Sequence, residues 1–227
     1  MITKRTYGEA CGLAHAGELV GERWALLVIR ELLLGPKRFT DLRAGIPRVS
    51  PNVLGQRLRE LEQAGIVRRR TLPPPAGSRV YELTEWGHEL EPIALGLGAW
   101  AARSPSFPYE AEIGVDSLVL ALKALFDPGA AGDLEVNSAL LLDGQSFHVN
   151  VSGGAIEVGR DGPADPEVTV ETDTATLNSV IMADRDLDDA IDSGKLVLDG
   201  SRDAFEALLG VLALPDPAPA AEPASVA

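Results

Sequence analysis

Apolar positions in the first fifty residues recur at helical spacing and predict a series of short helices. Segments 13–20 and 24–32 each place apolar side chains three and four positions apart, the repeat of one buried helix face. The pair Gly35-Pro36 is a strong stop signal after the second segment. Thr40 then opens a third, shorter helix, which we expect to end near Gly45.

The fourth predicted helix carries its own start signal and divides into an apolar and a polar part. Ser50-Pro51 supplies an N-cap side chain and a proline at the first helical position. Leu54, Leu58 and Leu61 then fall at i, i+4 and i+7 and form one buried stripe. Because these leucines face the core, the early polar residues lie on the other faces of the helix. Those residues are Asn52, Gln56 and Arg57.

A hairpin and a last helix complete the first half of the chain. Residues 66–71 and 79–83 read as two strands around the proline-rich turn 72–78. Thr84 caps the next helix, which continues to about Ala102. Its apolar residues are Trp86, Leu90, Ile93, Leu97 and Trp100. Such a helix is more often a dimer strut than a catalytic element.

The second half changes from helical to alternating periodicity. Residues 104–112 contain two prolines and read as a linker. Beyond it we expect a helix at 117–126, strands at 134–142, 147–151, 155–158 and 168–171, a helix capped by Thr174, a helix at 187–191, a strand at 195–198 and a helix at 202–214. This order predicts an α+β fold over 113–214, with an antiparallel sheet packed with helices. The Pro/Ala-rich tail 215–227 is predicted to be disordered.

Charge divides the chain at the same place as periodicity. The formal net charge is −14, yet residues 37–79 carry ten Lys and Arg against three acids, a local balance of +7. Residues 1–105 carry +4 and residues 106–227 carry −18. Net negative charge repels phosphate, so the charge of the whole chain argues against nucleic-acid binding. The basic island of residues 37–79 favours it. We therefore expect two domains with different partners.

The order of elements in the basic island is typical of a winged helix-turn-helix that reads DNA. Asn and Gln suit adenine and Arg suits guanine in the major groove. Arginines at the hairpin are placed for phosphate or the minor groove. The candidate DNA-binding residues are Arg48, Ser50, Asn52, Gln56, Arg57, Arg69, Arg70 and Arg79. Taken singly, an arginine run is usually a solvated face. It is the order of the helices and the hairpin that indicates DNA binding.

Residues 7–103 resemble HxlR-type winged-helix regulators, relatives of the MarR group. The likeness rests on Gly21-Glu22-Arg23-Trp24, Ile29-Arg30-Glu31-Leu32, Arg38-Phe39-Thr40-Asp41-Leu42, Ser50-Pro51-Asn52-Val53-Leu54, the run 58–67, Tyr81-Glu82-Leu83-Thr84 and Gly87. The resemblance implies a DNA-binding and dimerisation domain over 1–103. It further implies a homodimer on a two-fold-related operator, with dimer contacts from the first and last helices. The proline-rich tip 72–78 departs from the family pattern, which weakens the expectation of wing contacts there.

Cys11 is the single cysteine of the chain and has two interpretations. Some HxlR-type proteins sense oxidants or electrophiles through a cysteine near this position, so the resemblance permits a thiol sensor. The simpler interpretation is a small buried side chain on the first helix. No basic partner that would lower the pKa of the thiol is evident in the sequence.

Residues 113–214 resemble the sterol-carrier-protein type of fold. The likeness rests on the order of elements, on 165–170 and 174–177, and on the run 188–200 with its Gly194-Lys195-Leu196. It implies an apolar cavity for a lipid, sterol or acyl chain. The candidate lining residues are Phe126, Phe147, Val149, Leu177, Ile181, Met182, Phe205 and Leu209. Each is equally an ordinary core residue, and the domain could instead be a dimerisation module without ligand.

No pattern in the sequence indicates catalysis, a bound cofactor or a metal site. There is no nucleophile elbow or phosphate-binding glycine loop, and the acids between Asp184 and Asp192 lack the EF-hand spacing. Neither a secretory signal nor a membrane span is evident, so we expect a cytoplasmic protein. The sequence favours a homodimeric, sequence-specific transcriptional regulator with an apolar effector in its acidic domain. The alternatives are a lipid-binding or lipid-transfer protein and a regulator whose second domain is only structural.

Overall fold

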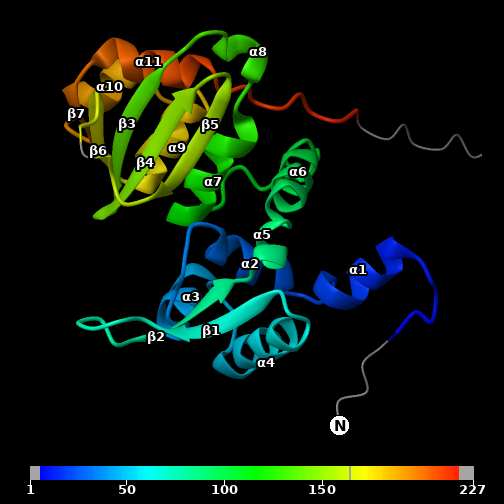
Figure 1. The fold of residues 1–227 in the computed structure, drawn as a ribbon. Coiled ribbons are helices and arrows are strands. Elements are labelled where there is room, and N and C mark those ends of the chain that lie inside the picture. The colour runs from blue at the N-terminus through cyan, green and yellow to red at the C-terminus, as the bar shows by residue number, and fades with distance from the viewer. Residues whose placement is uncertain (1–5, 164, 220–227) are drawn as a thin grey trace, which may run out of the picture. The chain divides into compact units, whose positions relative to one another are not determined.

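The computed structural model describes residues 6–163 and 165–219 and divides into two compact units, Met1–Ala94 and Leu95–Ala227. The first unit is helical with one hairpin, and the second is a sheet with helices on one face (Figure 1). The division falls inside a single helix, whereas the sequence analysis placed the end of the first domain at residue 103. Within the described chain, no helix is long and apolar enough to cross a membrane.

The first unit contains the helices and the hairpin expected from the sequence. Its elements are α1 (Gly12–Val20), α2 (Ala25–Leu33), α3 (Phe39–Gly45), α4 (Pro51–Gln63), β1 (Val67–Thr71), β2 (Arg79–Leu83) and α5 (Glu85–His88), and α6 (Glu91–Ala102) crosses into the second unit. The helix predicted to run from Thr84 to Ala102 is therefore two helices. Pro92 accounts for the break, because proline lacks the N–H that a continuous helix would use there.

The core of the first unit is built from the leucine stripe of α4 and the apolar face of α2. Leu54, Leu58 and Leu61 are all buried, as predicted, together with Val28 and Ile29 of α2. Ser50 caps α4, its hydroxyl oxygen accepting the backbone N–H of Val53 at 3.3 Å. Burial of the stripe fixes the rotation of α4 about its axis, and so decides which side chains reach solvent.

The hairpin is anchored at its base. Strands β1 and β2 pair antiparallel, with Val67 opposite Leu83 and Thr71 opposite Arg79. Lys37, between α2 and α3, exchanges two backbone hydrogen bonds with Tyr81 of β2, at 2.9 and 2.8 Å. The hairpin is thus tied to the helical core by backbone as well as by side chains.

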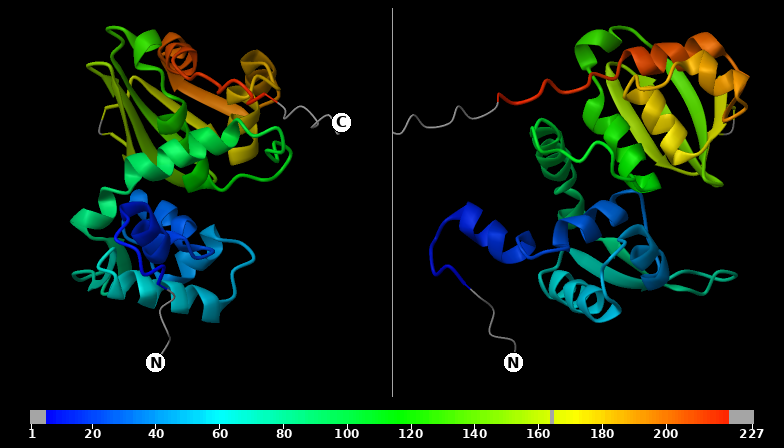
Figure 2. Two further views of the ribbon diagram at one scale, coloured as in Figure 1. Left: turned by 90° about the vertical axis from the view of Figure 1, so that its right-hand side faces the viewer. Right: turned by 180° about the vertical axis from the view of Figure 1, so that it is seen from behind.

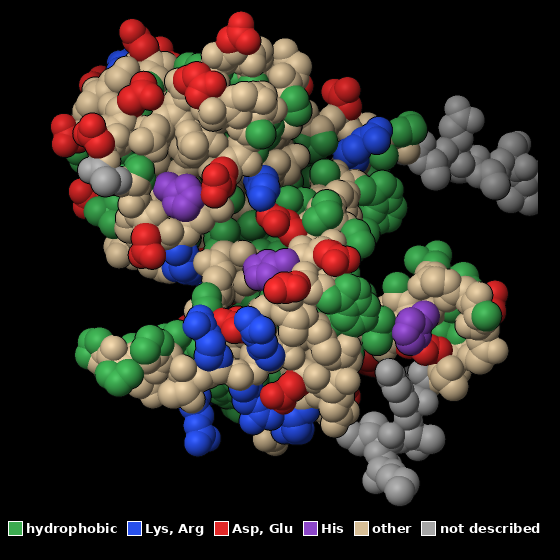
Figure 3. All heavy atoms as spheres, viewed as in Figure 1, with side chains coloured by type: hydrophobic (Ala, Val, Ile, Leu, Met, Phe, Trp, Pro, Cys, Tyr) green, Lys and Arg blue, Asp and Glu red, His purple; other side chains and the backbone are tan. Residues whose placement is uncertain are grey.

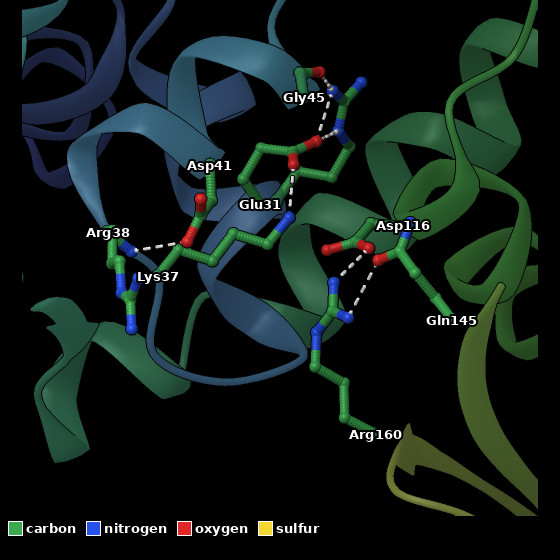
Figure 4. A network of polar contacts seen from close by, with 9 residues as sticks. Glu31, Lys37, Arg38, Asp41, Gly45, Asp116, Gln145 and Arg160 are labelled. Atoms are coloured by element: carbon green, nitrogen blue, oxygen red, sulfur yellow. Dashed lines mark hydrogen bonds and ion pairs between the residues drawn. The ribbon is translucent and has the colours of Figure 1, made fainter. Parts of the chain in front are cut away.

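A buried carboxylate holds the end of α3. Glu31 of α2 is 2 % exposed, and its two oxygens accept from Lys37 Nζ at 2.6 Å and Arg30 Nη2 at 2.7 Å (Figure 4). Arg30 Nη2 also donates to the backbone oxygen of Gly45 at 3.3 Å. This network lies directly beneath the turn that leads into α4. Neither its burial nor its partners were evident in the sequence.

The second unit has the predicted order of elements with one addition, the short helix α8 before the first strand. They are α7 (Val115–Leu125), α8 (Pro128–Ala131), β3 (Val136–Leu142), β4 (Gln145–Ser152), β5 (Ala155–Arg160), β6 (Val168–Thr172), α9 (Thr174–Ile181), α10 (Leu187–Asp192), β7 (Leu196–Gly200) and α11 (Arg202–Gly210). Asp173 rather than Thr174 caps α9, its carboxylate accepting the Thr176 N–H at 2.7 Å. That bond lowers the pKa of Asp173 because it favours the charged form.

The sheet is mixed, which corrects the expectation of an antiparallel sheet. The strand order is β5-β4-β3-β6-β7, and the β3–β6 pair is parallel, with Ser138 opposite Val168. Strand β6 does not continue the meander beside β5. It returns to the free edge of β3 instead, and β7 then pairs antiparallel with it.

One face of the sheet is buried beneath helices. Strand β4 alternates, with Phe147, Val149 and Val151 buried, and with His148 and Asn150 on the opposite side, as predicted. Helices α7, α9 and α11 cover the apolar face (Figure 2). Arg160 of β5 reaches Asp116 of α7 at 2.5 Å, with its guanidinium 5.0 Å from the Phe147 ring.

The start of the tail is bound rather than free. Arg103 Nε donates to the backbone oxygen of Asp216 at 2.9 Å, and the Ala218 N–H donates to the oxygen of Arg103 at 2.7 Å. Residues 220–227 of the predicted disordered tail lie outside the described residues.

Candidate nucleic-acid interface

Helix α4 presents one continuous polar face to solvent. Asn52, Arg59 and Gln63 are exposed, and Gly55 and Gln56 are half-buried. These positions are three or four residues apart, so they lie along one side of the helix, opposite the leucine stripe. Asn52 and Gln56 therefore occupy the face on which the sequence analysis placed them.

Arg57 lies differently from the expectation that it reaches toward DNA. It is 8 % exposed, its guanidinium is paired with Glu60, and Nη2 lies 3.6 Å from Glu22. Its buried Nε has no hydrogen-bond partner in the described chain. Position 57 follows Leu54 by three residues and precedes Leu58, so it lies at the border of the buried stripe. In this conformation the charge of Arg57 is paired with acids of its own chain, and Glu60 also accepts from Gln56 Nε2 at 3.0 Å.

The turn before α4 presents a strained arginine. Arg48 has φ of 74°, a left-handed conformation that costs a residue with a side chain about 1 kcal/mol or more. Its side chain is exposed. Ser50, two residues on, uses its oxygen to accept from Val53, which leaves the hydroxyl proton available to a phosphate oxygen. Both residues lie beside the N-terminus of α4, where the helix dipole favours an anion.

The three consecutive arginines of β1 are largely neutralised by acids. Arg68 and Arg70 lie on one side of the strand and share Glu82 of β2, at 2.7 and 2.9 Å. Arg69, on the other side, is paired with Glu62 of α4 at 2.5 Å, and this pairing raises its pKa. Glu82 is 8 % exposed, whereas the Arg69–Glu62 pair lies at the surface, where an ion pair contributes little to stability.

A smaller set of cations is left without an acid. Figure 3 shows Lys and Arg side chains gathered on the first unit, around the hairpin and α4. Among the described residues of this unit, the arginines that make no ion pair and no aromatic contact are Arg38, Arg43, Arg48, Arg59 and Arg79. Arg59 was not among the predicted DNA-binding residues, because those of α4 were taken from the N-terminal part of the helix.

Apolar side chains that the fold leaves exposed lie on α5 and α6. They are Trp86 of α5 and Ile93, Leu97 and Trp100 of α6, and the three on α6 are spaced by four and three residues along one side of that helix. These four residues form an apolar seam. Ile93 is 61 % exposed and Trp100 is 71 % exposed. Helix α1 has no buried residue, and together with α5 and the start of α6 it borders a groove of about 270 Å³.

Cys11 is the N-cap residue of α1 and is half-buried. Backbone N–H groups of Ala14 and Leu13 at the start of the helix lower the pKa of its thiol. No basic side chain is needed for this shift. The helix terminus causes it instead.

The apolar core of the second unit is nearly closed. Its cavity holds about 10 Å³ and is lined by Leu122, Leu140, Leu177, Phe205, Leu208, Leu209 and Leu212. Leu177, Phe205 and Leu209 were predicted to line a cavity. Phe147 and Val149 are buried elsewhere in the core, and Phe126, Ile181 and Met182 are half-buried outside the lining. Among the described residues, no three His, Cys, Asp or Glu side chains gather to hold a metal ion.

Two family models match separate parts of the chain. Residues 19–106 match the model described as HxlR-like helix-turn-helix, and residues 115–218 match the alkyl sulfatase C-terminal model. The match to the second model lies within the second unit. The sterol-carrier resemblance stays an expectation.

Known proteins similar to the chain fall into the same two groups. The HTH-type transcriptional regulator YodB of Bacillus subtilis is 43 % identical over 89 residues, covering 39 % of this chain and 80 % of YodB. The solved structure of quinone-bound YodB is 39 % identical, with a TM-score of 0.35, covering 39 % of this chain and 93 % of that one. The sec-alkylsulfatase Pisa1 of Pseudomonas sp. is 20 % identical, with a TM-score of 0.41, over 43 % of this chain. The matched part spans only 16 % of Pisa1.

Proposed function

This chain belongs to the HxlR-like helix-turn-helix family of DNA-binding transcriptional regulators, and we propose that it acts as a homodimer on a specific, two-fold-related operator. The observation that carries the proposal is the polar face of α4. Asn52 and Gln56 lie on that face, opposite a fully buried leucine stripe, and Arg48 flanks the capped N-terminus. A helix so presented fits the major groove, and a cation beside its N-terminus suits a phosphate.

The homodimer is supported by the apolar seam on α5 and α6. A monomer would leave Trp86 of α5 in water, together with Ile93, Leu97 and Trp100, which line one side of α6. The groove beside α1 offers further apolar surface to a second copy. Pairing two copies would place two α4 helices on successive major grooves, about 34 Å apart.

Selection from a random pool of duplex DNA with the full chain tests this function. We expect an inverted repeat whose half-site centres lie about 10 base pairs apart. The matched control replaces Asn52 and Gln56 with alanine, which removes base contacts but no charge. This variant should keep its salt-dependent, non-specific binding and lose the motif. Failure of the wild-type chain to enrich any motif, even at low salt, would refute the proposal.

The second unit is proposed to supply control by an apolar effector, in keeping with its resemblance to sterol carrier proteins. Leu177, Phe205 and Leu209 meet at one cavity, which supports the choice of site. A cavity of about 10 Å³ is smaller than any lipid, so binding requires α9 and α11 to move apart. The effector would act through its different affinity for the closed and the open core. The alternative remains a second unit that is only structural.

A thiol sensor at Cys11 is a second candidate function, supported by its position at the N-cap of α1. YodB, a relative, has been solved with quinone bound. A thiolate is the nucleophile toward a quinone, and the N–H groups of Leu13 and Ala14 favour the thiolate at residue 11. An operator complex of Cys11→Ala that is released by quinone as readily as the wild type would eliminate this role.

The reactivity of Cys11 should rise at a lower pH than that of an ordinary thiol. Because the folded-state pKa is lowered, the thiolate fraction near pH 7 exceeds that of the unfolded chain. The rate of alkylation by iodoacetamide, followed by mass spectrometry, should reach half its maximum at a lower pH in the folded than in the urea-unfolded chain. With one cysteine in the sequence, a single added mass reports this residue alone. Equal midpoints would contradict the assignment.

A further inference from the structure

We propose that Arg59 is the guanine-reading arginine of α4, with its guanidinium lying over the bare backbone of Gly55. The inference rests on the DNA-binding function proposed above and assigns the contact within it. Arg57, the arginine of α4 among the predicted DNA-binding residues, is instead buried and paired with Glu60. The proposal follows from three features of α4: an unexplained glycine, an arginine without an acid, and the direction of that arginine.

Gly55 has no structural reason to be glycine. Its backbone is helical, with no positive φ, and glycine destabilises a helix interior relative to alanine. An added Cβ would meet only Arg59 Nη1, at 3.5 Å, which is an ordinary contact. Glycine on the presented face of a DNA-binding helix is explained if another molecule approaches the backbone closely. The major-groove edge of a base pair is the partner that this fold brings there.

Arg59 is the charged residue of α4 that remains available for DNA. Its side chain is exposed and makes no ion pair within the described chain, whereas Arg57 is buried against Glu60. The pairing of Arg69 with Glu62 leaves Arg59 as the unneutralised cation of this face. Desolvating Arg59 against a base therefore breaks no existing pair.

The direction of the Arg59 side chain places its charge in the base-reading part of the helix. Helical side chains point toward the N-terminus of their helix, and Arg59 Nη1 lies level with Gly55, one turn back. The guanidinium thus reaches the level of Gln56 and approaches that of Asn52. These two amides suit adenine, and the guanidinium between them suits the O6 and N7 atoms of guanine.

Lysine at position 59 separates base reading from simple attraction to phosphate. Arg59→Lys keeps the charge and loses the planar fork that grips two acceptors. Operators selected with the wild-type chain should hold a guanine at one fixed position in each half-site. Arg59→Lys and Arg59→Ala should both lose that preference, while the other positions of the motif stay the same.

Base analogues give the decisive measurement on the selected operator. Replacing that guanine with 7-deazaguanine removes the N7 acceptor and should weaken wild-type binding by roughly 10- to 100-fold. The same replacement should change the affinity of Arg59→Ala by less than about 2-fold, since its contact is already gone. Fluorescence anisotropy at a fixed salt concentration measures the affinity of each protein, wild type and Arg59→Ala, for each operator, with guanine and with 7-deazaguanine.

Arg48→Gly is the comparison for a phosphate contact. Glycine accepts the left-handed backbone at residue 48, so the variant should fold at least as well, while it loses affinity for all sequences alike and has a smaller salt slope. If the Arg59 variants behave like Arg48→Gly, or keep the guanine preference, the inference is overturned. If the wild-type chain selects no motif, the proposed function fails instead.

Discussion

An Ile93→Asp chain is expected to be monomeric and to bind its operator about 100-fold or more weakly than the wild type. Ile93 is part of the apolar seam on α5 and α6, four residues before Leu97, and its side chain is 61 % exposed. An aspartate there would bring a charge into an apolar contact with the second copy, which costs more than the contact gains. A monomer holds one half-site at a time, so the gain in effective concentration from the second half-site disappears.

Val197→Asp is the matched control for Ile93→Asp. Val197 of β7 is similarly exposed, at 53 %, and lies outside the seam. Light scattering coupled to size exclusion should find this control dimeric and the Ile93 variant monomeric, with circular dichroism spectra like that of the wild type. An Ile93→Asp protein that remained a dimer with wild-type operator affinity would remove the seam from the dimer interface.

Gly45→Ala is expected to destabilise the first unit by roughly 2–4 kcal/mol. A Cβ at residue 45 would lie 2.0 Å from Glu31 Oε2 and 2.6 Å from its carboxyl carbon. That carboxylate cannot move aside cheaply, because it is buried and accepts from both Arg30 and Lys37. The substitution must therefore displace the carboxylate from its donors or push α3 away from α2.

Gly55→Ala is the same substitution in the same unit, but it should raise the free energy of unfolding rather than lower it. Its Cβ has space, so the variant should gain up to about 1 kcal/mol from helix propensity. Urea unfolding followed by tryptophan fluorescence measures both, since Trp24 and Trp86 lie in the first unit. If Gly45→Ala had the same urea unfolding midpoint as the wild type, the Glu31 carboxylate could move aside at little cost, contrary to this expectation.

Much of α4 could be predicted from the sequence, but the charge that it presents could not. The cap at Ser50 and the leucine stripe are local patterns, so the helix, its start and its buried face followed directly. The state of each arginine depends on acids that folding brings near. Glu22 and Glu82, which lie near Arg57 and beside Arg68, stand outside the basic island of residues 37–79. Counting charges within that island therefore overstated what is available to DNA.

The course of β6 was unpredictable for a similar reason. Turn signals in the sequence indicate only where a strand begins and ends. After the β3–β4–β5 meander, the next strand can pair with either edge strand, β3 or β5. Strand β6 pairs with β3 rather than with β5, and the β3–β6 pairing is parallel. The break between α5 and α6, by contrast, could have been predicted from Pro92. The strong apolar repeat of residues 86–100 favoured one continuous helix instead.

Two backbone hydrogen bonds join Lys37 to Tyr81, and they divide the β1–β2 hairpin into a fixed base and a free tip. Amide protons near the base are shielded by the helical core and should open only when the whole unit unfolds, whereas those of the turn 72–78 open locally. Under the proposed function, we expect the free tip to follow local variation in groove width on DNA while α4 keeps its position. Operators that differ in the shape of their flanks would then share one set of bases read by α4.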